Sequence, residues 1–151
     1  MVRKQILSKY QQNPPDSLKS EDDGRIIDTP SKLYPEMLAE LEKCAVIPVN
    51  QRTLDMMQIH HMDAGDLRKW LIAACKHGQY INSQWCQGSN PSGFFACDAY
   101  TVSGMLYMPH MKKEVETVVY VKMCITKTGA TVAVISIHPS YQQQTGADNE
   151  A

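Results

Sequence analysis

The chain has none of the short motifs that indicate nucleotide or metal chemistry. It contains no glycine-rich phosphate-binding loop, no dinucleotide-binding fingerprint and no zinc signature. No apolar run approaches the roughly 20 residues of a membrane-spanning helix. The first residues, Met1–Gln5, lack the apolar segment of a secretory signal. We therefore expect no nucleotide-dependent catalysis, no cofactor, no contact with a membrane and a cytoplasmic location.

Strong net charge and metal-ligand spacing are also missing. The 15 basic and 16 acidic residues give a net charge of -1, which argues against a high-affinity, sequence-independent nucleic-acid binder. The 5 cysteines follow no compact ligand spacing, and free thiols in a reducing compartment are expected. His60 and His61 are adjacent, so their side chains point in different directions, and no third ligand follows at a useful spacing. We expect no metal site.

The order of the sequence patterns predicts the fold class. Residues 1–30 mix turn formers with charges and indicate a flexible N-terminal arm; alternatively, the arm docks on the domain or on a partner. Residues 31–141 are expected to form a single α+β domain, and residues 142–151 a disordered polar tail. Helical patterns come first and strand patterns follow. This order predicts N-terminal helices packed on one face of a C-terminal antiparallel sheet of three to five strands.

The clearest strand signal is a hairpin near the end of the chain. Residues 115–126 and 130–138 are rich in β-branched side chains and flank Lys127-Thr128-Gly129, where glycine can take the left-handed position of a three-residue loop. That loop places Tyr120 opposite Ser136, and Val118 opposite His138. One face of the hairpin is then apolar. The core positions are Thr117, Val119, Val121, Met123, Ile125, Thr131, Ala133, Ile135 and Ile137.

The other face of this hairpin gathers groups that can do chemistry. It carries a phenol, an amine and an imidazole, and the imidazole can change its charge near neutral pH. The candidate catalytic residues are His138, Tyr120 and Lys122. Candidate substrate-binding residues are Lys112, Lys113, Asp98, Tyr100 and Ser136.

Interpretations without a catalytic or binding role stay open for the same residues. Asp98 is equally a hydrogen-bonded polar residue of the sheet, and the tyrosines are equally packing residues, because strands favour tyrosine. Cys86 followed by His138 has the chain order of a thiol hydrolase. The residues after Cys86 form a turn, however, and do not start the helix that would activate a nucleophilic thiol.

Three short segments resemble one family of toxins. Cys97-Asp98-Ala99-Tyr100, Val119-Tyr120-Val121-Lys122 and Val134-Ile135-Ser136-Ile137-His138 resemble consecutive strands of MqsR-type toxins of the RelE-like ribonuclease superfamily. The resemblance runs from about Leu54 to Ser140. It implies a small toxin that cuts messenger RNA without a metal and is neutralised by an antitoxin. The family's strand tyrosine falls on Tyr120, and its terminal lysine is replaced by His138.

Two functions therefore follow as expectations. The first is a metal-independent endoribonuclease toxin of RelE/MqsR type, or a degenerate relative, cutting RNA by 2′-hydroxyl attack. In it His138 transfers a proton, Tyr120 orients the phosphate or assists proton transfer, and Lys122 with Lys112 or Lys113 stabilises developing negative charge. The partners would be RNA and a cognate antitoxin or other protein. The alternative is a non-catalytic protein-binding module: an immunity, antitoxin or phage-encoded inhibitor protein.

Overall fold

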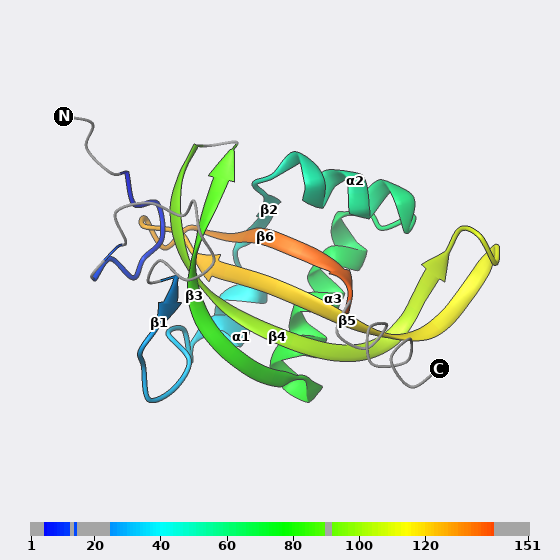
Figure 1. The fold of residues 1–151 in the computed structure, drawn as a ribbon, viewed down its shortest axis with the longest axis horizontal. Helices are drawn as coiled ribbons and strands as arrows, with labels where there is room; N and C mark the ends of the chain where they lie inside the picture. The colour runs from blue at the N-terminus through cyan, green and yellow to red at the C-terminus, as the bar shows by residue number, and fades with distance from the viewer. Residues whose placement is uncertain (1–4, 13, 15–24, 90–91, 141–151) are drawn as a thin grey trace.

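The computed structural model describes residues 5–12, 14, 25–89 and 92–140. Within these ranges the chain forms one six-stranded sheet, with the strand order β1-β3-β4-β5-β6-β2, and short helices (Figure 1). None of these helices is both long and apolar enough to cross a membrane. The elements in chain order are β1 (Ile26–Ile27), α1 (Met37–Leu41), β2 (Ala45–Pro48), α2 (Gln51–Ile59), α3 (Ala64–His77), β3 (Gln79–Ser89), β4 (Ser92–Met108), β5 (Lys113–Ile125) and β6 (Thr131–Pro139).

The predicted fold class is wrong in the order and the number of strands. The strand β1 precedes every helix and pairs with β3, while β2 lies between α1 and α2 and pairs in parallel with β6, so the sheet is mixed. Both strands are too short to show an alternating pattern in the sequence, and only pairing with distant strands defines them. Pro48 lacks an N–H and fits only at an edge, which is where β2 lies.

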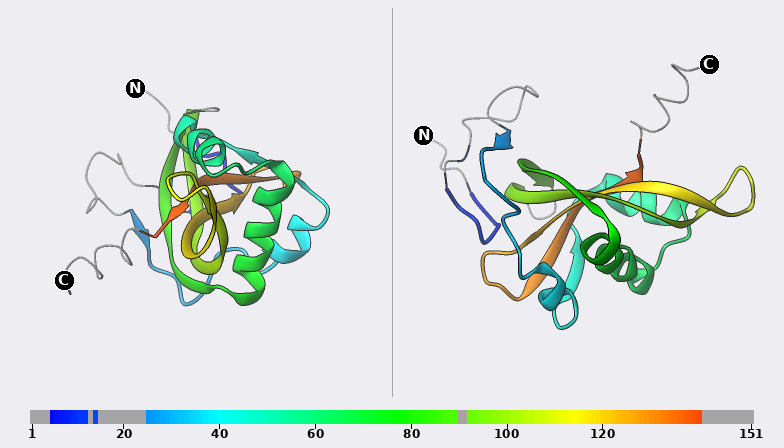
Figure 2. Two further views of the ribbon diagram at one scale, coloured as in Figure 1. Left: turned by 90° about the vertical axis from the view of Figure 1, so that its right-hand side faces the viewer. Right: turned by 90° about the horizontal axis from the view of Figure 1, so that it is seen from below.

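The helices α1 and α3 cover one face of the sheet, and the main hydrophobic core lies between the helices and this face (Figure 2). Asp63 starts α3 with a reciprocal capping box, in which its side chain accepts from the Asp66 N–H and the Asp66 side chain accepts from the Asp63 N–H. Leu67 and Leu71 of α3 are fully buried, as expected from their spacing on one side of the helix. The core therefore lies between these helices and the parts of β4 and β5 that pair with β3 and β6.

The opposite face is closed at one end because the sheet curls strongly there. The N–H of Ser89, at the end of β3, donates to the carbonyl of Val49 just after β2, at a distance of 3.1 Å. These two segments belong to strands near opposite edges of the sheet order. Cys86, Cys97 and Cys124 lie buried on this side as free thiols. These thiols belong to the same hydrophobic cluster as Leu67 and Leu71 of α3.

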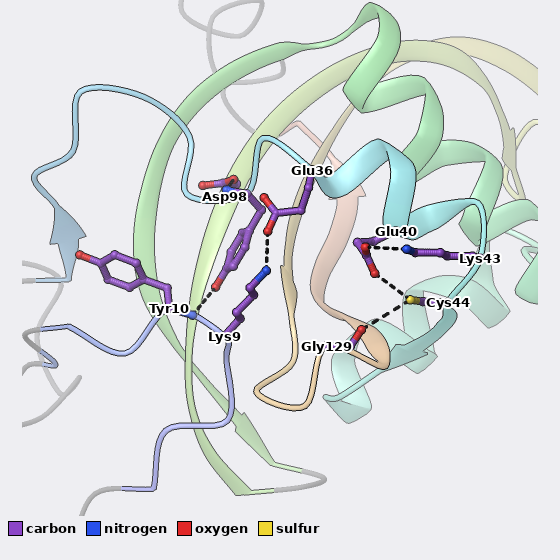
Figure 3. A network of polar contacts seen from close by, with 9 residues as sticks. Lys9, Tyr10, Glu36, Glu40, Lys43, Cys44, Asp98 and Gly129 are labelled. Atoms are coloured by element: carbon purple, nitrogen blue, oxygen red, sulfur yellow. Dashed lines mark hydrogen bonds and ion pairs between the residues drawn. The ribbon is translucent and has the colours of Figure 1, made fainter.

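Part of the segment that the sequence assigns to a flexible arm lies on the domain. The carbonyl of Gln5 accepts from Phe94 N–H, and Leu7 N–H donates to Phe94 O, each at 2.8 Å. Lys9 N–H donates to Ile125 O at 2.7 Å. The Lys9 ammonium also meets the Glu36 carboxylate at 2.8 Å (Figure 3). Residues 5–9 therefore connect β4 with the end of β5. The predicted tail, residues 142–151, lies outside the described residues.

The strands β4 and β5 continue beyond the rest of the sheet as a two-stranded hairpin (Figure 1). Pairing with β3 stops at Gln79 opposite Thr101, and pairing with β6 stops at Val119 opposite Pro139. The β4–β5 register continues to Met108 opposite Lys113. This projecting hairpin, residues 102–118, is flanked by no other strand of the described chain.

The predicted register of the β5–β6 hairpin is wrong by two residues at Tyr120. Tyr120 lies opposite His138, and Lys122 lies opposite Ser136. The connection is longer than three residues, because Thr126 N–H donates to Thr131 O. A β-bulge between Lys122 and Met123 then shifts the pairing again. On the core side, Val132 and Val134 therefore replace the predicted Thr131 and Ala133 as partners of Ile125 and Met123.

Candidate functional site

The β-bulge in β6 fixes the start of α2. Ile135 has no partner in the register, and its carbonyl accepts from Thr53 Oγ1 at 2.7 Å and from Asn50 Nδ2 at 3.2 Å. The Asn50 amide oxygen accepts from the Ser89 N–H at 3.0 Å. Two side chains at the beginning of α2 thereby tie this helix to β6 and to β3. Arg52 follows from the same turn, and its position relative to the sheet is set by these bonds.

A polar pocket of about 410 Å³ lies where α2, β3 and β6 meet. Two arginines, one lysine, one histidine and no acidic residue are among the described residues that line it. The shared property of these groups is affinity for an anion, because arginine and lysine donate charge-assisted hydrogen bonds to phosphate oxygens. We call this site the basic pocket. Its lining is Arg25, Asn50, Arg52, Thr53, Met56, Cys86, Gln87, Lys122, Ile135, Ser136, Ile137 and His138.

His138 is the titratable group of the basic pocket with the clearest chemical role. Its Nδ1 lies 2.7 Å from the carbonyl oxygen of Pro139, which can only accept, so Nδ1 carries the proton and Nε2 is the basic nitrogen. Burial lowers the pKa of His138, and the nearby charges of Arg52 and Lys122 lower it further, against the hydrogen bond to Pro139, which raises it. The imidazole is therefore neutral near pH 7 and can accept a proton.

Tyr120 lies behind His138, outside the lining of the basic pocket. The two rings stack with their centroids 5.5 Å apart at an interplanar angle of 20°. The Lys122 ammonium lies 5.6 Å from the centre of the same phenol ring, and Gln84 Nε2 donates to its hydroxyl at 3.3 Å. Burial raises the pKa of Tyr120, so the phenol stays protonated. This geometry makes Tyr120 a support for His138 and Lys122.

The structure places Asp98 and Tyr100 away from the basic pocket, on the helix-covered face. The Asp98 carboxylate is fully buried and accepts from Leu33 N–H and Tyr34 N–H, each at 2.9 Å, and from Ser83 Oγ at 2.6 Å. It therefore holds the chain segment that leads into α1 against the sheet. Tyr100 is buried in the main core.

Lys112 and Lys113 lie at the tip of the projecting hairpin. Lys113 is seven positions along β5 from Tyr120, which corresponds to roughly 23 Å at the usual rise of a strand. The two lysines therefore cannot contact the same phosphate as His138. Ser136, by contrast, lines the basic pocket beside His138.

Sequence reasoning missed the polar pocket residues that lie outside the β5–β6 hairpin, among them Arg25, Arg52 and Asn50. An arginine before a two-residue strand and an exposed arginine on a helix have no periodic signal that predicts what they approach. The capping position of Asn50 was a usable signal, because it indicated the start of a helix. Cys86 and His138 do line one pocket, but a hydrogen bond with Cys97, together with burial, holds the pKa of Cys86 well above its ordinary range. Cys86 is therefore a thiol and not an activated nucleophile.

Among residues 5–12, 14, 25–89 and 92–140, no group of three or more His, Cys, Asp or Glu side chains is arranged to hold a metal ion. His60 and His61 have other contacts: His60 Nδ1 lies 2.8 Å from Tyr107 O, and the His61 ring stacks on Tyr107 at 4.0 Å. No family model, curated protein or solved structure matches the chain. The resemblance to MqsR-type toxins stays a prediction.

Proposed function

We propose that the protein binds the phosphodiester backbone of RNA in the basic pocket and cleaves it without a metal ion. The observation that supports this most is the composition of the pocket. Arg25, Arg52 and Lys122 line the pocket together with His138, and the described lining residues include no carboxylate. A phosphate group complements such a site in charge and in hydrogen bonding. The low overall charge of the protein makes this a local property and not a general attraction to polyanions.

The reaction uses the 2′-hydroxyl of RNA as the nucleophile. Its proton passes to Nε2 of His138 while its oxygen attacks the phosphorus atom. The bond from phosphorus to the 5′-oxygen breaks, and that oxygen takes a proton from the Lys122 ammonium, leaving a 2′,3′-cyclic phosphate. Arg25 and Arg52 stabilise the charge on the phosphorane oxygens. Tyr120 does not touch the phosphate; its ring positions the imidazole and the ammonium.

The test is cleavage of short RNA oligonucleotides by the purified protein in the presence of a chelator. The cyclic phosphate product is identified by mass spectrometry, and a substrate with a 2′-deoxy sugar at the cleavage position must stay intact. His138→Ala should lower the rate on the order of a hundred-fold or more while RNA binding is retained. Arg52→Ala should weaken binding roughly 10- to 100-fold, the usual worth of a hydrogen bond to a charged group.

Lys76→Ala is the matched control for the loss of a positive charge. Lys76 is exposed on α3 and does not line the basic pocket. Its variant should bind and cleave RNA like the wild-type protein. Cleavage at an unchanged rate in His138→Ala would remove this residue from the mechanism. Equal RNA binding by the wild-type, Arg52→Ala and Lys76→Ala proteins would contradict the role of the pocket.

A protein-binding module is the second candidate, and the projecting hairpin favours it. Met105 and Met111 of this hairpin region are 53% and 45% exposed, and flexible methionine side chains suit binding surfaces for other proteins. In that case Met111→Glu should abolish the effect of the protein in cells, whereas His138→Ala should not change it. The reverse pattern would favour the ribonuclease.

A further inference from the structure

The projecting hairpin leaves one edge of β4 without a neighbouring strand. The Thr101 carbonyl faces Gly78, since a Cβ atom on this glycine would lie 2.6 Å from it. The Tyr107 carbonyl accepts from His60 Nδ1 at 2.8 Å on the same side. In an antiparallel strand, alternate residues direct both their N–H and C=O groups to the same edge. Ser103 and Met105 therefore direct theirs to this edge, and within the described chain no hydrogen bond to another segment covers them.

This edge is short. His60 already occupies the Tyr107 carbonyl, and β3 begins at the other end, next to Thr101. Only Ser103 and Met105 remain between these limits. Their groups form an adjacent acceptor and donor, namely the Ser103 carbonyl and the Met105 N–H on either side of Gly104. Added strands usually have at least three residues, so a peptide strand finds too little room, whereas a small planar heterocycle fits.

A second pocket, of about 400 Å³, lies along this edge, between it and α3. Its size is within the range of sites for small ligands. The indole of Trp70 lies directly against Gly104, because a Cβ atom there would be 2.8 Å from the ring. The His61 and Tyr107 rings form a parallel stack at 4.0 Å and 13° beside it. Met62, Ala73 and Leu106 are apolar neighbours in the same lining. We call this site the aromatic pocket.

We propose that the aromatic pocket binds a nucleobase. A base presents adjacent donors and acceptors along its edge and apolar faces above and below. The Ser103 carbonyl and Met105 N–H match the edge, and the aromatic rings match the faces, since stacking on aromatic side chains is a general mode of base binding. Lys69 and Glu114, also in the lining, offer a cation for the phosphate and an acceptor for an amino group.

This inference rests on the proposed function and extends it to the recognition of RNA. Arg52 of the basic pocket and His60 of the aromatic pocket lie eight residues apart along α2, or about 12 Å along the helix axis. A phosphate in the basic pocket and the base of a nearby nucleotide in the aromatic pocket would occupy both sites together. The aromatic pocket would then select where the chain is cut.

The experiment titrates the full-length, 15N-labelled protein with adenosine, guanosine, cytidine and uridine, their 5′-monophosphates and RNA tetranucleotides. The amide signals of Met105 and Ser103 should shift with at least one nucleoside. Trp70 fluorescence should change too, since the other tryptophan, Trp85, is buried. Ala73→Leu, which fills the pocket, should weaken binding by about tenfold or more. Ala39→Leu, at an exposed position of α1, is the matched control and should not.

Met105→Pro is a second variant, in case the larger side chain disturbs the packing of α3. It removes the N–H at the free edge, where proline is tolerated, and replaces the methionine side chain with the smaller proline ring. It should weaken nucleoside binding while leaving the circular dichroism spectrum unchanged. Tighter binding of tetranucleotides than of monophosphates would show that the aromatic pocket binds a base of RNA. The opposite order would show that it binds a free nucleotide.

The two proposals fail in different ways. Lys122→Ala changes the basic pocket alone, so nucleoside binding should not change in this variant. Nucleoside binding without any RNA cleavage would leave the aromatic pocket as proposed and overturn the ribonuclease. RNA cleavage without a shift at Met105 from any nucleoside or tetranucleotide would overturn the aromatic pocket. A shift caused only by an extended peptide would overturn it as well.

Discussion

Replacing Asp98 tests whether its carboxylate supports the fold or binds substrate. The fully buried carboxylate accepts from the N–H groups of Leu33 and Tyr34 and from the Ser83 hydroxyl. Ser83 keeps a second partner, the Tyr80 hydroxyl at 2.6 Å. Asp98→Ala therefore leaves two N–H groups without an acceptor. At roughly 1–3 kcal/mol for each group, the expected loss is about 2–6 kcal/mol of unfolding free energy. Such domains have about 5–15 kcal/mol in total.

Urea unfolding followed by the fluorescence of buried Trp85 measures this loss. Asp28→Ala is the control, because Asp28 is exposed and its loss should change the free energy by no more than about 0.5 kcal/mol. Asp98→Asn keeps one carbonyl oxygen as an acceptor, so it should be less destabilised than Asp98→Ala. The folded Asp98→Asn protein should bind RNA normally. Equal urea midpoints for Asp98→Ala and Asp28→Ala would refute the structural role of Asp98. Weak RNA binding by the folded Asp98→Asn protein would indicate that Asp98 contributes to RNA binding.

Three further outcomes are expected. Burial and the charges of Arg52 and Lys122 lower the pKa of His138, so on the acid side of the pH–rate profile RNA cleavage should fall as the pH drops below 6.5 through this lowered pKa. Arg52→Ala removes one of these charges and should move the acid limb to higher pH. Gly104→Val places a side chain where the Trp70 ring lies, so thermal unfolding should show a loss of roughly 1–3 kcal/mol, and a neutral result would contradict this contact. Gly129 has a φ of 77° with open space around it, so Gly129→Ala should cost about 1–2 kcal/mol in urea unfolding, through backbone strain and not through a clash.

The long central strands were the predictable part of the fold. Runs of β-branched residues with turn formers between them located β5 and β6 closely. Gly104 is a weak point in a strand pattern, because glycine has no side chain to pack and often marks a bulge or a bend. In the structure β4 is continuous from Ser92 to Met108. Glycine stands there because Trp70 packs against the backbone, and this contact is invisible in a local pattern.

The candidate site was predictable only where it depends on one hairpin. Alternation along β5 and β6 brought Tyr120, Lys122, Ser136 and His138 to one face, and the strand pairing agrees with that grouping. Arg25 and Arg52 reach the same place from a short edge strand and from a helix. Their approach depends on the curl of the sheet and on bonds to Ile135, which join residues about 80 positions apart. A local sequence pattern cannot predict these contacts, because the two bonded residues lie too far apart in the chain.

The β-bulge at Ile135 explains why a wrong register still gave the right face. The longer connection before Thr131 shifts the pairing by one residue, which alone would turn His138 away from Tyr120. The extra residue in β6 shifts it once more and restores the alternation. The same residue frees a carbonyl that binds Asn50 and Thr53, and so brings Arg52 toward His138. One irregularity therefore aligns the hairpin side chains and positions the helix that completes the basic pocket.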